Sequence, residues 1–143
     1  MKISDLSQIP GRRFPAGRLS QRLVGEDLSI DAEGFCLGHV TLDPLGGQVP
    51  WHSHPNEEIY MILEGEAEMA LGDEVLILRA GQVVYIPSGE FHQLTNLSEK
   101  RTKFLYCYSP AGDVEHWRQE LDGTLPRSGD GAPALPTGSS PQH

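Results

Sequence analysis

The sequence contains little cysteine, little positive charge and no long apolar run, and each shortage excludes a class of protein. Its two cysteines, Cys36 and Cys107, are too few for a disulfide framework. Both lie in apolar runs, which is typical of reduced, buried thiols in a cytosolic chain. The 11 Lys and Arg residues are outnumbered by 20 Asp and Glu, so the net charge of −9 disfavours nucleic acid and anionic membrane surfaces as partners. No segment approaches the roughly 18 apolar residues of a membrane span, and the first residues lack the apolar run of a secretory signal. We therefore predict a cytoplasmic protein without nucleic-acid or membrane partners.

The length of 143 residues indicates a single domain that can bury a core without help from disulfides or a structural metal. Residues 1–22 contain several Pro and Gly breakers, so we interpret them as an N-terminal arm with at most a short strand. The arm carries the only basic cluster, made of Arg12, Arg13, Arg18 and Arg22. We interpret this cluster as solvated. The alternative is that it meets an acidic face of a second subunit or an anionic substrate.

Residues 23–110 consist of short strand-like runs separated by turn residues. The expected strands are 23–30, which is weak, 35–42, 57–63, 66–71, 74–78, 83–86, 91–95 and 103–108. Between two of them, Gly72 and Asp73 are the signal of a two-residue hairpin. Short strands in regular succession, with turns between them, predict an all-β sandwich or barrel over residues 23–110.

One short helix and a tail follow the strands. Over residues 111–123, Asp113 is placed to cap a helix and Gly123 to end it. Trp117 begins a short apolar stripe, which we expect to pack the helix on the barrel. Residues 124–143 are rich in Pro, Gly and Ser and have almost nothing to bury, so we predict a tail that is disordered or extended as a strap on a neighbour.

Four residues of ligand type occur in two blocks of the strand region. His52 and His54 are two apart, so on a strand their side chains share one face, with Cα atoms about 6–7 Å apart. Glu58 follows a turn and can approach from the next strand, and a barrel would bring His92 near from further along the chain. Neutral imidazoles with one carboxylate suit Fe, Mn, Co, Ni, Cu or Zn. We therefore predict that His52, His54, Glu58 and His92 bind one divalent metal ion per chain, whose identity these residues do not determine.

The spacing of these residues resembles the cupin superfamily. The superfamily's first motif is a Gly, a His-x-His pair, a Glu and a second Gly, matched here by Gly46, His52, His54, Glu58 and Gly65. The second motif is matched by Gly81, Pro87, Gly89, His92 and Asn96. The resemblance covers about residues 42–108 and implies an all-β cupin double-stranded β-helix, a jelly-roll-like barrel, here with one short C-terminal helix. It also implies a central metal ion and, frequently, a homodimer.

Tyr60 is the candidate catalytic side chain, because strand parity places it on the same face as Glu58. It could donate a hydrogen bond to a bound substrate or act as a general acid or base; the alternative is a core tyrosine. Some small cupin lyases carry a tyrosine two residues after the glutamate, as here. Trp51 should face away from the metal, for packing or a dimer contact. No metal role is assigned to His39, His116 or His143, and the directions of Tyr85, Tyr106 and Tyr108 remain open.

A metal that prefers six ligands and receives four from the protein keeps about two positions open, which predicts catalysis or ligand capture. Four functions are compatible with such a site: an Fe(II)-dependent dioxygenase, a redox-neutral decarboxylase, isomerase or lyase acting on a small acid or sugar, a non-enzymatic binding module, and a structural storage protein. The intact ligand set argues against the last. We favour an enzyme acting on a small oxygenated molecule, with a slight preference for the dioxygenase.

Overall fold

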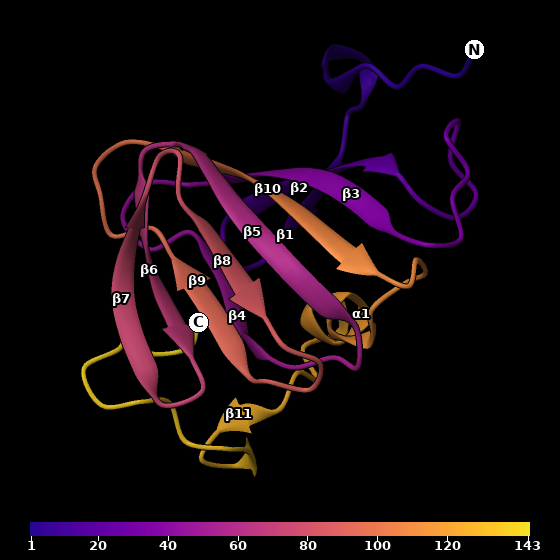
Figure 1. Cartoon of the computed structure of the whole chain (residues 1–143). Helices are drawn as coiled ribbons and strands as arrows, with labels where there is room; N and C mark the ends of the chain where they lie inside the picture. Colours follow the sequence, from indigo (N-terminus) through magenta and orange to yellow (C-terminus); the bar gives the residue numbers. More distant parts are fainter.

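The computed structural model describes all 143 residues and is built on two antiparallel sheets that lie face to face (Figure 1). The larger sheet has the order β1-β2-β3-β10-β5-β8 and the smaller one β4-β9-β6-β7. The larger contains β1 Arg12–Phe14, β2 Arg18–Val24, β3 Cys36–Leu42, β10 Thr102–Ser109, β5 Glu57–Glu64 and β8 Val83–Ile86. The smaller contains β4 Gln48–His52, β9 His92–Thr95, β6 Glu66–Leu71 and β7 Glu74–Arg79. The predicted all-β, jelly-roll-like fold is confirmed.

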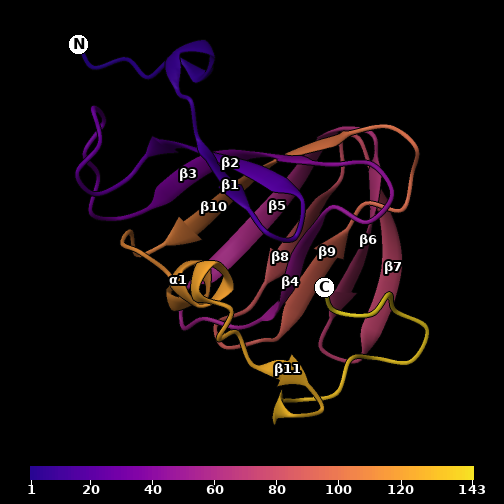
Figure 2. The same cartoon turned by 180° about the vertical axis from the view of Figure 1, so that it is seen from behind.

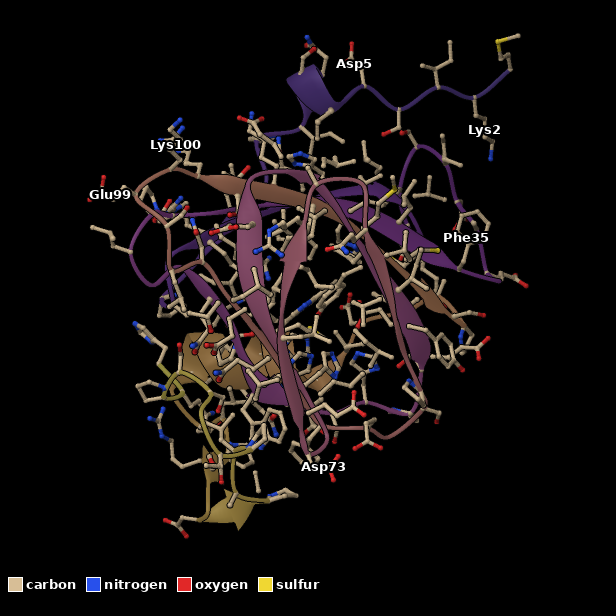
Figure 3. All side chains as sticks on the ribbon, turned by 60° about the vertical axis from the view of Figure 1, so that its left-hand side comes forward. Lys2, Asp5, Phe35, Asp73, Glu99 and Lys100 are labelled. Atoms are coloured by element: carbon tan, nitrogen blue, oxygen red, sulfur yellow. The ribbon has the colours of Figure 1, made fainter.

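The core lies between the sheets because side chains alternate along each strand (Figure 3). On β5, Glu58 and Tyr60 both point inward and are buried, as parity predicted. On β10, Tyr106 and Tyr108 also point inward, each at most 4% exposed. Tyr85 on β8 points outward and is 55% exposed. The interior of the barrel is thus lined by tyrosines beside a buried carboxylate.

The turn chemistry follows the sequence closely. The β6–β7 hairpin turns at Gly72, whose φ is 58°. Gly65 and Gly81, which end strands in the two cupin motifs, have φ values of 82° and 89°, a conformation that glycine adopts without strain. The side chain of Asn96 fixes the end of β9, since its amide donates to the carbonyls of Asp43 at 3.1 Å and Lys100 at 2.7 Å.

The N-terminal residues differ from the solvated arm that we expected. A 3₁₀ turn, Leu6–Gln8, precedes β1, and β2 begins at Arg18 inside the predicted arm and pairs with β3. Arg18 faces the barrel interior and is 2% exposed, whereas Arg13 remains on the surface in an ion pair with Asp43. An inward arginine breaks the apolar alternation that marks a strand, so the pattern concealed β2.

The single α-helix, α1, spans Glu115–Asp122 and closes one end of the barrel (Figure 1). Its N-cap is Val114 and not the expected Asp113, whose carboxylate pairs with Arg22 at 3.4 Å. Gly123 ends the helix with φ 71°, as predicted, and Trp117 packs against the core. No helix has the length and apolar character needed to cross a membrane.

The tail returns over the outer face of the four-stranded sheet (Figure 2). It contains the short pair β11 Arg127–Ser128 and β12 Gly131–Ala132. Gln93 donates to the carbonyl of Ser140 at 2.9 Å, and the backbone of Ser140 donates to Glu68 at 2.7 Å. Trp51 faces away from the barrel interior and donates to the carbonyl of Pro133 at 2.9 Å. The tail is therefore an extended strap on its own chain, whereas we had considered disorder or a strap on a neighbour.

Candidate metal centre

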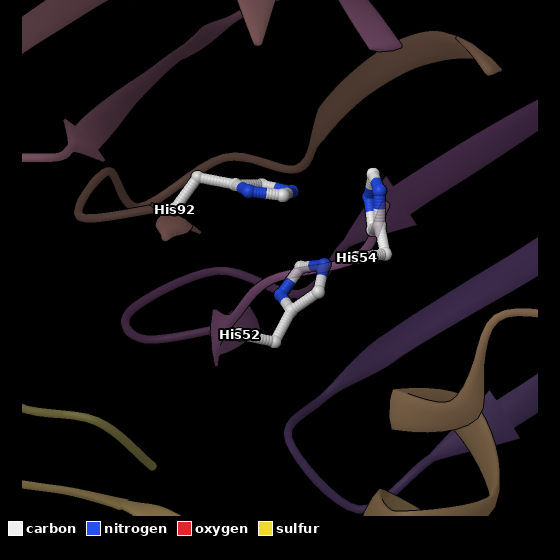
Figure 4. A group of neighbouring side chains, drawn as sticks. All are labelled: His52, His54 and His92. Atoms are coloured by element: carbon white, nitrogen blue, oxygen red, sulfur yellow. The ribbon is translucent and has the colours of Figure 1, made fainter. Parts of the chain in front are cut away.

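Three imidazoles meet inside the barrel (Figure 4). His52 ends β4 and pairs across the sheet with His92 at the start of β9, and His54 follows two residues after His52. One ring nitrogen of each residue lies within 4.8 Å of those of the other two. All three side chains are buried, so the spacing in the sequence and the pairing of β4 with β9 together produce one cluster.

Each ring is oriented by a hydrogen bond from its Nδ1 to a backbone carbonyl. The distances are 2.7 Å from His52 to Pro50, 2.9 Å from His54 to Asn56 and 2.9 Å from His92 to Glu90. A carbonyl can only accept, so each Nδ1 carries a proton, and a neutral ring then keeps its lone pair on Nε2. The Nε2 atoms of His52 and His92 are buried and have no hydrogen-bond partner. Buried lone pairs that converge without donors are what a metal ion would satisfy.

Glu58 brings a carboxylate to the same cluster from β5. Its Oε2 lies 2.8 Å from Nε2 of His54 and 3.4 Å from Nε2 of His92. An imidazole nitrogen and a carboxylate oxygen this close share a cation, which is either the proton of a hydrogen bond or a metal ion that both would bind. Burial alone would raise the pKa of Glu58, but the hydrogen bond from His54 and the nearby ring of His92 lower it, so the carboxylate is ionised. The residues present therefore fit a divalent ion.

His52 is held in the neutral form that binds metals. Burial, together with the neighbouring rings of His116 and His92, lowers the pKa of His52 well below its ordinary value. Because a protonated imidazole cannot bind a metal, this shift extends the range of metal binding toward acid.

Tyr60 lies beside the cluster, with its ring centre 5.9 Å from that of His92 and 4.8 Å from that of Phe104. It lines an internal cavity of about 20 Å³ together with Glu58. Burial and the charge of Glu58 raise the pKa of Tyr60 well above its ordinary value. The phenol therefore stays protonated and can serve as a hydrogen-bond donor toward the cavity.

Sequence reasoning missed a group next to the cluster, the triad Arg18, His116 and Glu120. The ring of His116 stacks on that of His52, with centres 3.7 Å apart. Its Nδ1 lies 2.8 Å from Glu120, which also binds both guanidinium Nη atoms of Arg18. Burial lowers the pKa of His116 to about 4. The one available signal was the spacing of His116 and Glu120, which are four apart on one helix face.

The remaining histidines stay outside the cluster. His39 is buried on β3, away from the three rings. His143 ends the tail, where its backbone amide donates to Gln48 at 2.7 Å. Neither has the position of a metal ligand.

Sequence comparisons point to one family. A family model described as "Cupin domain" matches residues 38–108, about half of the chain. The uncharacterized protein MJ1618 of Methanocaldococcus jannaschii is 37% identical over 68 residues, which are 47% of this chain and 54% of that protein. Dimethylsulfoniopropionate lyase DddQ of Ruegeria pomeroyi is 39% identical over 71 residues, which are 49% of this chain and 35% of that protein. The chain thus spans about half, or less, of the length of these two relatives.

A solved structure extends the likeness to the whole barrel. The crystal structure of a predicted oxalate decarboxylase from Thermotoga maritima matches with a TM-score of 0.68, covering 76% of this chain and 98% of that chain. The two sequences are 23% identical, so this likeness concerns the fold alone. With two facing antiparallel sheets, both sequence motifs in place and the match of the family model, the chain belongs to the cupin superfamily.

Proposed function

We propose that the protein is a metal-dependent enzyme acting on a small oxygenated molecule, with His52, His54, Glu58 and His92 as ligands of one divalent ion. The observation that carries this proposal is the pair of buried, unpartnered Nε2 atoms beside an ionised carboxylate. Fe, Mn, Zn, Ni, Co and Cu all accept this donor set. Four protein ligands leave coordination positions for a substrate, which a purely structural site would not.

The surrounding residues support catalysis by binding and orientation. A divalent ion at this site would supply Lewis-acid chemistry toward a substrate oxygen. Tyr60 keeps its proton and lines the cavity beside Glu58, so it can donate a hydrogen bond to such an oxygen. The Nε2 atoms of His52 and His92 are closed off from solvent, so bulk water is kept from the reacting groups.

For the reaction itself we propose redox-neutral bond cleavage, as in a lyase or a decarboxylase. The sequence alone slightly favoured a dioxygenase. The lyase activity in the name of the relative DddQ supports the redox-neutral class instead. A neutral tyrosine that donates to a substrate oxygen also fits stabilisation of developing negative charge. The dioxygenase is the alternative.

Turnover with and without oxygen separates these classes. Protein loaded with Mn(II) or Zn(II) is incubated under nitrogen with a panel of small acids and sugars, and protein loaded with Fe(II) is incubated in air with diketones, phenols and thiols. We expect product under nitrogen with no oxygen uptake. Oxygen consumption coupled to substrate loss would establish the dioxygenase, and binding without turnover on both panels would establish a non-enzymatic binding module.

We further propose a homodimer formed through the outer face of the six-stranded sheet, in a reducing cytoplasm. Ile59 and Tyr85 are neighbours across β5 and β8 and are 38% and 55% exposed; Val83 nearby is 53% exposed. A contiguous apolar patch on a sheet face is typical of an interface. Both cysteines are free thiols, as a reducing compartment requires.

A further inference from the structure

Arg18 is a permanently charged group inside the barrel. It projects inward from β2, is 2% exposed and lies over the ring of Phe14 with its guanidinium carbon 3.9 Å from the ring centre. It lines the same internal cavity as Glu58 and Tyr60. A guanidinium does not lose its proton in proteins, so a buried one always requires an anion. The cavity beside the metal ligands therefore contains a built site for a negatively charged group.

In this structure the anion comes from α1. The carboxylate of Glu120 binds Arg18 through two parallel hydrogen bonds, of which the one from Nη2 to Oε1 is 2.7 Å long. This is the planar, bidentate geometry in which arginine binds carboxylates in general. One helical turn earlier, His116 stacks on His52. The helix thus places the imidazole of His116 on His52 and the carboxylate of Glu120 on Arg18.

The space beside the metal ligands is too small for a substrate while α1 stays in place. The internal cavity of about 20 Å³ holds about one water molecule, which is too little for an organic substrate. A groove of about 830 Å³ lies on the outer side of α1, between the helix and the β1–β2 hairpin. Ser20, Val114 and Trp117 line both the groove and the cavity, so α1 forms the partition between them. Displacing α1 would join the two spaces.

Displacing α1 also removes Glu120 from Arg18 and leaves the cation in the barrel without its anion, which favours the binding of another anion in its place. We propose that Arg18 is the anion-binding subsite of the metal centre, and that Glu120 occupies it until the carboxylate of a small organic acid displaces the α1 helix. The use of this subsite by a substrate rests on the proposed function, whereas the binding of a carboxylate to Arg18 does not. A substrate carboxylate on Arg18 would lie in the cavity that Glu58 and Tyr60 also line.

Calorimetric titration of metal-free protein, dialysed free of chelator, tests the subsite with malonate as the probe. Glu120→Gln keeps the shape of the side chain but removes the competing charge, so its affinity for malonate should exceed that of the wild type by about tenfold or more, the factor by which a mostly closed state weakens binding. The uncharged isostere malonamide should bind neither protein. Asp43→Asn is the matched control, because it frees the exposed Arg13 from a similar pair and should leave the affinity unchanged.

Wild-type protein gives a second readout that does not depend on a variant folding. Malonate should accelerate hydrogen exchange of the backbone amides in α1, while the amides of β6 keep their rates. Equal malonate affinity in wild type and Glu120→Gln, or malonate binding with unchanged exchange in α1, would overturn the subsite. Because no metal is present in either experiment, such a failure would leave the proposed metal-dependent function standing, and a failure to bind metal would leave the malonate result standing.

Discussion

At the residue scale, Tyr60 is the clearest case of a side chain with two possible roles. Its ring packs in the core against Phe104, while its position beside Glu58 in the cavity suits a contact with substrate. Replacing it with phenylalanine removes only the hydroxyl, so packing is nearly unchanged and the two roles can be separated.

We expect Tyr60→Phe to retain its metal and its melting temperature but to lose turnover by at least about tenfold, since a catalytic proton donor typically contributes about 100-fold or more. Elemental analysis and steady-state kinetics on the same preparation provide the measurement. An unchanged turnover rate would show that Tyr60 has only a structural role.

His116 makes the stability of the metal-free protein depend on pH. Its pKa falls from 6.5 in the unfolded chain to about 4 in the folded one, because burial disfavours the charged ring. The unfolded state therefore binds the proton first as the pH is lowered. Stability is full above pH 6.5 and is lost progressively as the pH falls toward 4.

The resulting loss of unfolding free energy is about 3 kcal/mol at most, at about 1.4 kcal/mol per pH unit. Urea denaturation of metal-free protein between pH 7 and pH 4 measures this loss. His116→Gln should reduce the dependence of the unfolding free energy on pH. The pH dependence that remains in the variant is assigned to His52, whose pKa is also lowered on folding. Identical slopes in wild type and variant would contradict this account.

The metal cluster could be anticipated from single residues, whereas the triad beside it could not. His52 and His92 lie at strand ends and His54 follows two residues after His52, so their meeting follows once the barrel is assumed. Arg18 and Glu120 are 102 residues apart and meet only because α1 folds back over β2. No local pattern reports such a contact, and each side chain alone looks like a solvated charge.

At the scale of elements, the close packing of β3 against β10 depends on a glycine. Gly38 pairs with Tyr106, and a Cβ at position 38 would lie 2.2 Å from Cζ of that tyrosine. The ring of Tyr106 stacks in turn on Tyr108, with centres 5.8 Å apart, so it has little room to move. The packing of β3 against β10 therefore leaves no room for a side chain at position 38.

Gly38→Ala should therefore reduce the free energy of unfolding by about 1–3 kcal/mol, the usual cost of overpacking a core. Gly34→Ala is the control, because nothing lies within 4 Å of its added methyl group and its change should stay within about 0.5 kcal/mol. Chemical denaturation of both variants measures these changes. Equal free energies of unfolding would show that the ring of Tyr106 adjusts freely.

Element boundaries were predictable where local chemistry decides them. The strand expected at 66–71 is β6 Glu66–Leu71, and the helix ends at Gly123 as expected. The prediction failed for β2, where an inward arginine hides the pattern, and for the N-cap, where Asp113 pairs with Arg22 instead. In both cases a contact from elsewhere in the fold overrides the local preference.

At the scale of the whole molecule, the outer face of the six-stranded sheet predicts a dimer. Ile59→Glu places a charge in the middle of the apolar patch and should convert the dimer into a 15.7 kDa monomer. Size-exclusion chromatography with light scattering gives the mass directly. Leu97→Glu is the control, since Leu97 is 50% exposed and lies outside that sheet. A monomeric wild-type protein would show that this face is not a dimer interface.

The barrel does not depend on the metal for its core, because the hydrophobic cluster between the sheets is formed by apolar side chains and tyrosines. A variant that loses the metal should therefore remain folded. This allows metal binding to be measured apart from folding. His39 provides the matched control, because it is a buried strand histidine outside the cluster.

The most direct measurement is the metal content, by elemental analysis, of wild type, His54→Ala and His39→Ala purified without added metal, each checked for folding by circular dichroism. We predict close to one divalent ion per chain in wild type and in His39→Ala, and almost none in a folded His54→Ala. Equal metal content in all three proteins, or none in wild type even after reconstitution, would contradict the account.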